Sequence, residues 1–393
     1  MYLLEHDAKQ LLASHGIPVP EGKLFERDAT LHRAAIPQGP WIVKGQVAAG
    51  GRGKAGLIRK AATMQDIASH MNAIVGAALK GRTVDAVRIE KQVTGAEEAY
   101  IGLLLDPEGG GVRVIVSAQG GMDVEQLPAA SIRSEVAPAE PGALAACAAR
   151  LAAAIEGPKG KALADAGARL ARIFLEREAL LIEVNPLFVH PDGSWTAGDA
   201  KVVTDDNALA RQEALRVLLQ QRAHAYTDVA RKEEHGFDYV VVDPEGEIGL
   251  LTTGAGLSMM LIDELRAAGL RPYNFLDIRT GGLRGEVKRV VQVLQWIREG
   301  RRVKVLLVNI FAGITDLAEF SKLLVEALAA VPALQVPVVA RLVGNGLPAA
   351  REVLAQAGIA LHTDLDDAIA AMRLHLAQRT GARESGRAED GTR

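Results

Sequence analysis

From about Phe237 onward, short apolar runs alternate with helical segments, and this alternation restricts the fold more than any other feature of the sequence. The runs read DYVVV, EIGLLTT, NFLDI, VKVLLVNIF, VPVVARL and IALH. Strands that alternate with helices form a parallel sheet with right-handed crossover connections. We therefore expect a parallel α/β domain over about 237–377. The polar residues 378–393 are expected to form a disordered tail.

Four of these strands run into glycine turns that open helices: 252–256, 279–282, 312–315 and 344–346. The carboxyl ends of parallel strands share one edge of a sheet, where ligands usually bind. Free backbone N–H groups and the positive ends of helices favour an anion there. We interpret this edge as a candidate phosphate or carboxylate site, which Arg279 would strengthen. The alternative is that the glycines only turn the chain and that Arg279 faces solvent.

The first 232 residues follow a different pattern, which predicts an α+β domain. Short strands and a helix at about 64–79 make up a small subdomain at about 22–91. Two apolar runs joined by a Pro/Gly turn within 99–121 predict a β-hairpin. A long Ala-rich helix and a second hairpin, turning at 191–193, follow. A polar helix at about 208–232 is expected to connect the two halves of the chain.

The stretch VKGQVAAGGRGKAGLIRK, residues 43–60, combines glycines with basic side chains and suggests a phosphate-binding loop. It does not have P-loop spacing, because Ala48 stands where the first glycine should be. Ala55 likewise stands where the Mg²⁺-binding serine or threonine should be. If this segment holds a triphosphate, it must do so by other chemistry.

A nucleotide grip without a P-loop needs a lysine for the phosphates, flexible backbone to cover them, and oxygen ligands for Mg²⁺. Lys44 lies on a strand just before the glycine loop, and Gly51–Gly53 can bring N–H groups close to a phosphate. Asn185 and Asp199 fall on neighbouring strands of the second hairpin and are a candidate Mg²⁺ pair. Each has a structural alternative, since a buried strand lysine usually pairs with a carboxylate and Asn-Pro often marks a turn.

Composition excludes several classes of function. The formal net charge of −3 and an aromatic content of 4% argue against a nucleic-acid or anionic-membrane partner. The single cysteine, Cys147, cannot form an internal disulfide and reads as a buried helix residue. The N-terminal residues lack the apolar segment of a signal peptide, and no apolar run approaches the ~20 residues of a membrane span. We therefore expect a cytoplasmic location.

Eight motifs, taken in order, resemble those of the succinyl-CoA synthetase (succinate–CoA ligase) β-subunit family, and malate–CoA ligase β chains look similar. They are VKGQVAAGGRGKAG, IEKQVTGAEEAYIG, IEVNPL, GDAK, DDNAL, TGAGLSM, NFLDI and VNIFAGI. The resemblance runs from Met1 to about Ala371. It implies an ATP-grasp first half and a flavodoxin-like CoA-ligase domain in the second half.

The reaction implied is reversible formation of an acyl-CoA from a dicarboxylic acid, CoA and ATP, through an acyl phosphate and a phosphohistidine. In the family, that histidine and most CoA contacts belong to a separate α subunit. None of the nine histidines of this chain matches it, so we expect the chain to be inactive without an α subunit. Pro20 matches the ATP-using branch of the family, which makes GTP the less expected nucleotide.

The resemblance also assigns site residues. The triphosphate-binding positions of the family match Lys44, Gly51, Arg52 and Gly53. Lys54 and Lys60 are therefore less expected to contact the phosphates. Further nucleotide-binding positions match Glu90, Val93 and Glu98. The Mg²⁺ ligands match Asn185 and Asp199, and the carboxylate that meets the phosphohistidine matches Glu183. The substrate- and phosphate-binding turn matches Gly313, Ile314 and Thr315.

Several residues differ from those usual in the family, and the differences bear on which carboxylic acid the site binds. Thr253 stands where the family usually has asparagine, and Arg279-Thr280-Gly281-Gly282 replaces a triple-glycine turn. Ala312 in NIFAGI replaces a glycine, and malate-type chains have the same motif. We hypothesise that Thr253 and Arg279 adapt the site to a relative of succinate.

Two other functions stay open at this point. One is a non-catalytic regulatory paralogue, against which the presence of Lys44, Glu98, Glu183, Asn185 and Asp199 argues. The other is a self-sufficient ATP-grasp ligase such as a carboxylate–amine ligase, against which the CoA-ligase turns of the second half argue.

Overall fold

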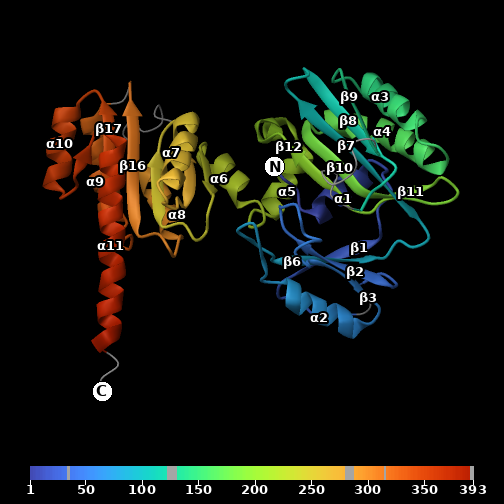
Figure 1. Cartoon of the computed structure of the whole chain (residues 1–393), viewed down its shortest axis with the longest axis horizontal. Helices are drawn as coiled ribbons and strands as arrows, with labels where there is room; N and C mark the ends of the chain where they lie inside the picture. The colour runs from blue at the N-terminus through green and yellow to red at the C-terminus, as the bar shows by residue number, and fades with distance from the viewer. Residues whose placement is uncertain (33–35, 122–130, 279–286, 314–315, 390–393) are drawn as a thin grey trace. The chain divides into compact units, whose positions relative to one another are not determined.

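The structure, a computed structural model, describes residues 1–32, 36–121, 131–278, 287–313 and 316–389 of the 393-residue chain. The chain forms two compact units, Met1–Ala225 and Tyr226–Arg393 (Figure 1). Within the described residues, none of the helices has both the length and the apolar character needed to cross a membrane.

A four-stranded antiparallel sheet in the first unit carries the glycine-rich stretch. Its strands lie in the order β1-β6-β2-β3, and helix α2 packs along one face (Figure 1). Val43 and Ile89 point to that face and are fully buried, whereas Lys44 and Glu90 point to the other face, toward the N-terminal helix α1. The elements are α1 Glu5–Ser14, β1 Gly22–Glu26, β2 Trp41–Gln46, β3 Ile58–Ala61, α2 Met64–Ile74 and β6 Ala86–Lys91.

Helix α2 is shorter than the sequence suggested. A capping box between Thr63 and Asp66 starts it, and it ends at Ile74 because Gly76, with φ +85°, turns the chain away. Residues 78–79, expected to be helical, form the short strand β4 (Ala78–Leu79), which pairs with β5 (Arg82–Thr83).

A larger antiparallel sheet completes the first unit and contains both expected hairpins. The order is β11-β10-β7-β8-β9, and β12 also pairs with β10, so the two hairpin predictions are confirmed. Its strands are β7 Glu97–Asp106, β8 Gly111–Ser117, β9 Ile132–Ala137, β10 Ala179–Val189, β11 Trp195–Ala197 and β12 Lys201–Thr204.

The Ala-rich segment forms two helices and not the single long helix expected. Helix α3 (Pro141–Ala153) and helix α4 (Pro158–Glu176) are separated at Gly157, whose φ of +76° breaks the helix before Pro158 starts the next one. The small residues let the two helices approach closely, since a Cβ on Gly167 would lie 2.3 Å from that of Ala148. Cys147 is buried in α3, as expected.

The expected connector helix is also divided. Its residues form the 3-10 helix η4 (Asp206–Arg211) and helices α5 (Glu213–Gln221) and α6 (Thr227–His235). Arg222 pairs with Asp7 of the first unit, while Arg231 pairs with Glu299 of the second unit. The chain therefore leaves one unit and enters the other between α5 and α6, slightly before the expected boundary.

The second unit is built on the expected parallel sheet. Strands β14 (Ile248–Thr252), β16 (Val305–Ala312), β17 (Val338–Gly344) and β18 (Leu361–His362) are parallel and lie in this order. The prediction that all six apolar runs join one parallel sheet is wrong for two of them. Strands β13 (Asp238–Val241) and β15 (Asn274–Asp277) form an antiparallel pair.

Strand β15 is tied to β14 by a side chain. The Asn274 amide nitrogen donates to Leu250 O, and its amide oxygen accepts from Leu250 N, both at 2.9 Å. Backbone bonds between β14 and the segment that contains β15 lie at the two ends: Ile248 N donates to Arg271 O, Tyr273 N to Ile248 O, and Ile278 N to Thr252 O. Asn274, together with the Thr252 hydroxyl that donates to Leu276 O at 2.6 Å, therefore replaces the missing ladder bonds. Strand partners of this kind are not encoded in local periodicity.

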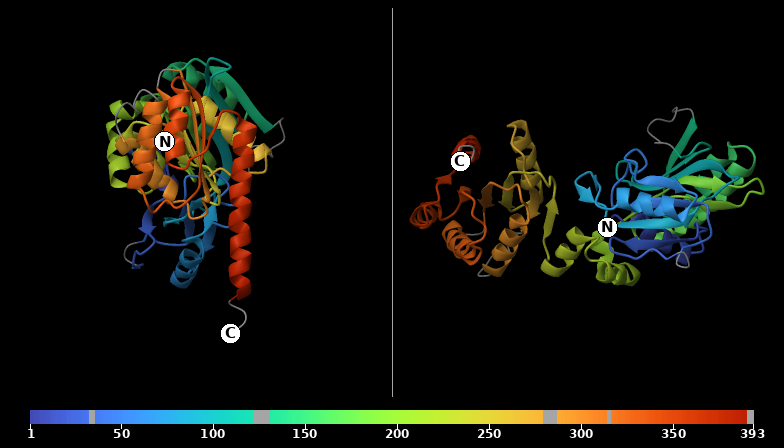
Figure 2. Two further views of the ribbon diagram at one scale, coloured as in Figure 1. Left: turned by 90° about the vertical axis from the view of Figure 1, so that its left-hand side faces the viewer. Right: turned by 90° about the horizontal axis from the view of Figure 1, so that it is seen from below.

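Helices cover both faces of the parallel sheet. Apolar residues of α7 and α11 pack on one face, and those of α8, α9 and α10 pack on the other. Helix α11 runs through residues 378–389, so the expected disordered tail is helical as far as Glu389 (Figure 2). Alanine, arginine, glutamine and glutamate are strong helix formers, which explains the continuation. The helices are α7 Ala255–Ala267, α8 Val287–Arg298, α9 Leu317–Ala330, α10 Leu347–Gln356 and α11 Leu365–Glu389.

Candidate functional site

The glycine loop between β2 and β3 turns one arginine inward. Gly51 has φ +91°, a conformation that favours glycine, and a Cβ on Gly51 or Gly53 would meet no atom within 4 Å. Arg52 between them is buried, whereas Lys54 and Lys60 are exposed. The side of the loop that carries the two glycines is therefore open to a ligand.

Lys44 lies beneath this loop on β2. Its Nζ donates to Glu5 Oε1 at 2.7 Å and to the Gly198 carbonyl at 2.8 Å. It also pairs with Glu90 Oε1 at 2.8 Å. The pairing of a buried strand lysine with carboxylates, noted above as its structural alternative, is thus present, and it also holds the ammonium group next to the loop.

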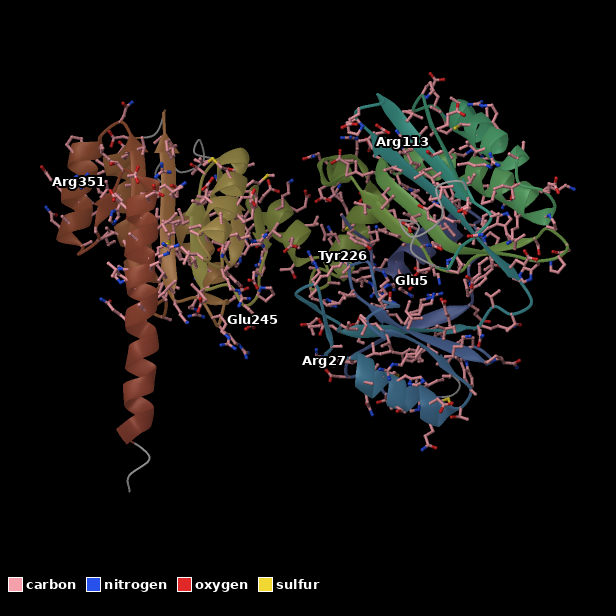
Figure 3. All side chains as sticks on the ribbon, viewed as in Figure 1. Glu5, Arg27, Arg113, Tyr226, Glu245 and Arg351 are labelled. Atoms are coloured by element: carbon pink, nitrogen blue, oxygen red, sulfur yellow. The ribbon has the colours of Figure 1, made fainter. Side chains whose placement is uncertain are left out.

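A buried group of charged side chains, which we call the charge cluster, surrounds Lys44 (Figure 3 shows Glu5, one of its members, between the two sheets of the first unit). Four cations face three carboxylates, so the cluster carries one excess positive charge. Such an excess favours an anionic ligand, because an unbalanced charge away from water is costly. The members of the cluster are Glu5, Lys9, Lys44, Arg52, Arg88, Glu90 and Asp199.

The cluster shifts the protonation of its members in a consistent way. Burial disfavours the ionised form of Glu5, but Lys44, Lys9 and Arg52 outweigh it and hold the pKa of Glu5 well below its usual range. Burial and the neighbouring Arg88 lower the pKa of His6 to about 4. The neutral His6 ring then accepts a hydrogen bond through Nδ1 from Arg88 Nη1 at 2.8 Å. Charged carboxylates and a neutral imidazole therefore coexist in one small region.

Arg52 joins the loop to the candidate Mg²⁺ ligand Asp199. Its Nη2 donates to both carboxylate oxygens of Asp199 at 2.8 Å, and its Nη1 donates to Glu5 Oε2 at 2.5 Å. Burial raises the pKa of Asp199, and the guanidinium opposes that rise. The two groups form a charge-assisted contact that occupies the carboxylate.

The candidate ligands offer the oxygen chemistry that Mg²⁺ prefers. Asn185 lies on β10, as expected, where its Oδ1 accepts from Gly121 N at 2.7 Å. Asp199 does not lie on a strand as predicted but in the turn between β11 and β12. Within the described ranges, no group of three or more histidine, cysteine, aspartate or glutamate side chains could hold a metal alone. The residues fit a magnesium ion whose coordination is completed by phosphate oxygens and water.

Glu183 lies near these residues on β10. It is half-buried and 3.8 Å from Lys201 Nζ. Tyr2 lies in the same neighbourhood, and burial raises its pKa to about 12. Arg52 opposes this rise, whereas Asp199 and Glu183 add to it. Burial and Glu183 also raise the pKa of Tyr100. The Glu183 carboxylate therefore lies within electrostatic reach of both phenols.

The remaining nucleotide-binding candidates spread outward from the cluster. Glu90 accepts from Lys9 and Arg88 and is 2% exposed, whereas Val93 is half-buried and Glu98 is exposed. The Glu98 carboxylate lies against Gly121, where a Cβ would come within 1.7 Å of it. Gly121 therefore brings Glu98 and the candidate metal ligand Asn185 to one place. The Pro20 carbonyl accepts from Arg88 Nη2 at 2.8 Å.

The described glycine turns of the second unit share the carboxyl edge of the parallel sheet, as expected. Thr253 and Gly254 follow β14, Gly313 follows β16, and Gly344 ends β17. Gly254 caps α7 with φ +83°, and its N–H donates to Asp277 Oδ1 at 2.8 Å. Thr253 is buried. Arg279, Ile314 and Thr315, all predicted for this site, lie outside the described residues.

Polar side chains form a row across the sheet just below this edge. Thr252, Asn309 and Arg341 occupy the same register on β14, β16 and β17. Arg341 donates to Asn309 Oδ1 at 2.9 Å and stacks over the ring of Phe311, 4.6 Å from its centroid. The row supports the edge from beneath with side chains, while the turns themselves offer backbone groups.

A surface cavity of about 420 Å³ lies elsewhere in the second unit, where α8 and α9 end. Trp296, Glu299 and Val331 are among its lining residues. Because α9 begins beside the glycine turns, its far end lies away from them, and none of the predicted site residues lines the cavity.

Several members of the charge cluster were missed in the sequence, namely Glu5, Lys9 and Arg88. A signal existed for two of them: Glu5 and Lys9 stand four residues apart, on one face of a helix that also carries Leu12. Arg88 and Glu90 alternate with the apolar residues Val87 and Ile89 on β6. Charges at such positions are usually solvated, so burial could not be inferred from spacing alone.

Two family models match the chain. An ATP-grasp domain model matches residues 2–189, and a CoA-ligase model matches residues 251–374. The expected fold classes are therefore confirmed for both units.

Curated relatives match nearly the whole chain. The succinate–CoA ligase [ADP-forming] subunit beta of Chloroflexus aurantiacus is 38% identical over 366 residues, covering 91% of this chain and 94% of the relative. The subunits beta of Thioalkalivibrio sulfidiphilus and Aquifex aeolicus are 36% and 33% identical and cover 92% and 91% of this chain, and 96% and 94% of their own lengths.

A solved structure shares the fold. ATP citrate lyase from Methanothrix soehngenii, solved with citrate and coenzyme A, superposes with a TM-score of 0.70 at 18% identity. The match covers 96% of this chain and 99% of that chain. At this level of identity the likeness supports the fold alone.

Proposed function

The chain belongs to the succinate–CoA ligase β-subunit family, and on this basis we propose that it is the nucleotide-binding subunit of a heteromeric, ADP-forming acid–CoA ligase. Such an enzyme forms an acyl-CoA from a carboxylic acid and CoA while ATP becomes ADP and phosphate. The observation that carries the proposal is the charge cluster beneath the open glycine loop. Its excess positive charge, contributed by buried Lys44 and Arg52, suits a triphosphate.

In this proposal the first unit binds and orients the nucleotide. Lys44 and Arg52 neutralise phosphate oxygens, and the N–H groups of Gly51 and Gly53 cover them. Glu90 and Val93 border the base, and Glu98 faces the sugar. When bound, Mg²⁺ would neutralise further phosphate charge, held by Asn185 and Asp199. Phosphoryl transfer needs such positioning more than covalent protein chemistry.

The phosphoryl group must then leave the first unit. We propose that a histidine of a separate α subunit accepts it next to Glu183, whose half-buried carboxylate lies near Lys201. The same α subunit would supply most CoA contacts. The chain would then be inactive alone, because it binds the nucleotide but lacks the group that carries the phosphate onward.

The second unit would receive the phosphate and the acid. The helix that follows Gly313–Thr315 and the helix that Gly254 caps begin at one sheet edge, where helix dipoles favour anions. The carboxylates of Asp316 and Asp277 accept from some of the N–H groups there, so the helix dipoles and the remaining N–H groups would hold the anion. Thr253 and Arg279 replace family residues at this edge. We therefore place the choice of acid there and propose a relative of succinate, such as a substituted dicarboxylate or malate.

Co-expression with the α chain encoded by the adjacent gene tests the proposal. Purified complex is assayed for ADP release that depends on ATP, CoA and acid, over a panel of dicarboxylates with GTP as the alternative nucleotide. We expect activity with the complex and none with either chain alone. Activity of this chain by itself, or no CoA-dependent turnover with any acid, would contradict the assignment.

The acid preference has a separate test. Arg279→Gly restores the family residue, so the ratio of kcat/KM between succinate and its substituted relatives should shift toward succinate. A strict preference for succinate that Arg279→Gly leaves unchanged would remove Arg279 from the acid site while leaving the ligase assignment intact.

A further inference from the structure

Glu5 connects three cations of the charge cluster. Its Oε1 lies 2.7 Å from both Lys9 Nζ and Lys44 Nζ, and its Oε2 lies 2.5 Å from Arg52 Nη1. The side chain is 1% exposed, so all of its charge is neutralised by protein groups. No motif of the sequence assigned it a role, and a buried carboxylate with three cationic partners is a costly device for holding one helix in place.

Arg52 has two distinct sets of partners. One end of the guanidinium, Nη1, is held by Glu5 and by the Gly45 carbonyl at 3.3 Å. The other end, Nη2, covers both oxygens of Asp199. Because Mg²⁺ would need those oxygens, Nη2 occupies the carboxylate that the proposed metal requires. Gly51 and Gly53 leave room for the loop around Arg52 to adjust.

We propose that Glu5 is a positioning residue of the nucleotide site, which keeps Arg52 anchored through Nη1 while Nη2 exchanges Asp199 for a nucleotide phosphate. This inference rests on the proposed function for the identity of the ligand. Glu5 does not touch the nucleotide in this scheme; it acts through Arg52, which its Oε2 holds, and through Lys44, which its Oε1 holds.

The exchange leaves neither Arg52 nor Asp199 without an opposite charge. Without a ligand, Asp199 is neutralised by Arg52; with the metal–nucleotide bound, the metal neutralises Asp199 and the phosphate neutralises Arg52. An arginine with no second anchor would have to desolvate as a free cation during the exchange, which is expensive in a buried site. The fixed contact with Glu5 avoids that state.

The first experiment measures Mg–ATP binding to the full-length chain by titration calorimetry. Glu5→Gln keeps the shape of the side chain and removes its charge, so affinity should fall roughly 10- to 100-fold, the usual effect of losing a charged hydrogen bond. Glu178→Gln is the matched control, because it breaks a pair with Arg211 in the same unit away from the cluster and should leave affinity unchanged.

A double-mutant cycle separates positioning from a structural role. If Glu5 acts mainly through Arg52, Glu5→Gln should cost at least about 5-fold less affinity in an Arg52→Gln background than in the wild type. Equal losses in both backgrounds would show that Glu5 only stabilises the fold, and would overturn the inference.

The third measurement does not depend on whether Glu5→Gln folds. Arg52→Gln should bind Mn²⁺ alone more tightly than the wild type, because Asp199 has lost its competitor, and should bind Mg–ATP more weakly. Electron paramagnetic resonance would measure the Mn²⁺ affinity, which should rise in Arg52→Gln while the Mg–ATP affinity falls. Unchanged or weaker Mn²⁺ binding would overturn the exchange. Failure of the wild type to bind Mg–ATP would instead count against the proposed function.

Discussion

The two units carry candidate anion sites of different kinds. The first unit collects charged side chains in a buried cluster, where Lys44 and Arg52 are held by Glu5. The second unit presents glycine turns such as that at Gly254 at a sheet edge where helices begin, and there the positive ends of the helix dipoles favour an anion. A side-chain site concentrates its energy in a few replaceable groups, whereas a backbone site spreads it over atoms that most substitutions leave in place. The two units should therefore respond very differently to mutation.

The largest effect is expected at Asp199. Asp199→Ala removes both the partner of Arg52 and the candidate metal ligand, so ligation by the complex with the α subunit should fall by more than about 100-fold. Assembly of the two subunits, followed by size-exclusion chromatography, should be unaffected.

Asp192→Ala provides the control for Asp199→Ala. Asp192 lies in the exposed turn of the same hairpin and bonds only with Ser194 among the interactions described. Its activity should match the wild type. Full Mg²⁺-dependent activity of Asp199→Ala would refute the metal assignment.

Lys44→Met should be the next most damaging change. It leaves Glu5 and Glu90 with fewer cationic partners, and breaking a buried pair costs about 3–5 kcal/mol of unfolding free energy. Denaturant unfolding and the KM for ATP should both report the loss. Lys60→Met, on the exposed edge of β3, should change stability by less than about 0.5 kcal/mol. Similar behaviour of the two variants would mean that Lys44 is not part of a coupled cluster.

Acid should destabilise the first unit through His6. Its pKa is about 4 in the folded chain, against an ordinary value of 6.5, so the unfolded chain binds the proton more readily. Stability is therefore complete above about pH 6.5 and is lost progressively as pH falls toward 4, by up to about 3 kcal/mol.

His6→Gln should flatten this pH dependence. The amide can still accept the hydrogen bond from Arg88 but does not titrate. Unfolding midpoints in urea at several pH values would measure the slope, with exposed His224→Gln as the control. A slope equal to that of the wild type would show that His6 contributes no linkage.

The smallest effect is expected at Thr253. Thr253→Ala removes a hydroxyl but leaves the N–H groups of the turn, so the KM for the acid should rise by less than about 10-fold. The KM for ATP should not change, and Thr253→Ser should restore the acid KM. A loss as large as that of Asp199→Ala would mean that the edge depends on this side chain after all.

The sequence predicted the second unit's edge better than the first unit's cluster, and for a physical reason. A turn such as that at Gly254 requires φ near +83°, which glycine alone adopts easily, so the residue type marks the geometry. The pairing of Glu5 with Lys44 joins residues 39 positions apart and leaves no local trace. Strand partners were likewise hidden, since β13 and β15 have the same apolar character as the parallel strands but form an antiparallel pair.

Asn274 gives the second unit a point where hydrogen exchange would be unusually informative. Between the paired strands of the parallel sheet, amide protons are protected by the backbone of the neighbouring strand, but that of Leu250 is held by a side chain. Its exchange rate therefore depends on whether one amide group stays in place. The boundary between β14 and β15 can thus be weakened or strengthened by changing a single residue, without disturbing the hydrogen-bond ladder that joins β14, β16 and β17.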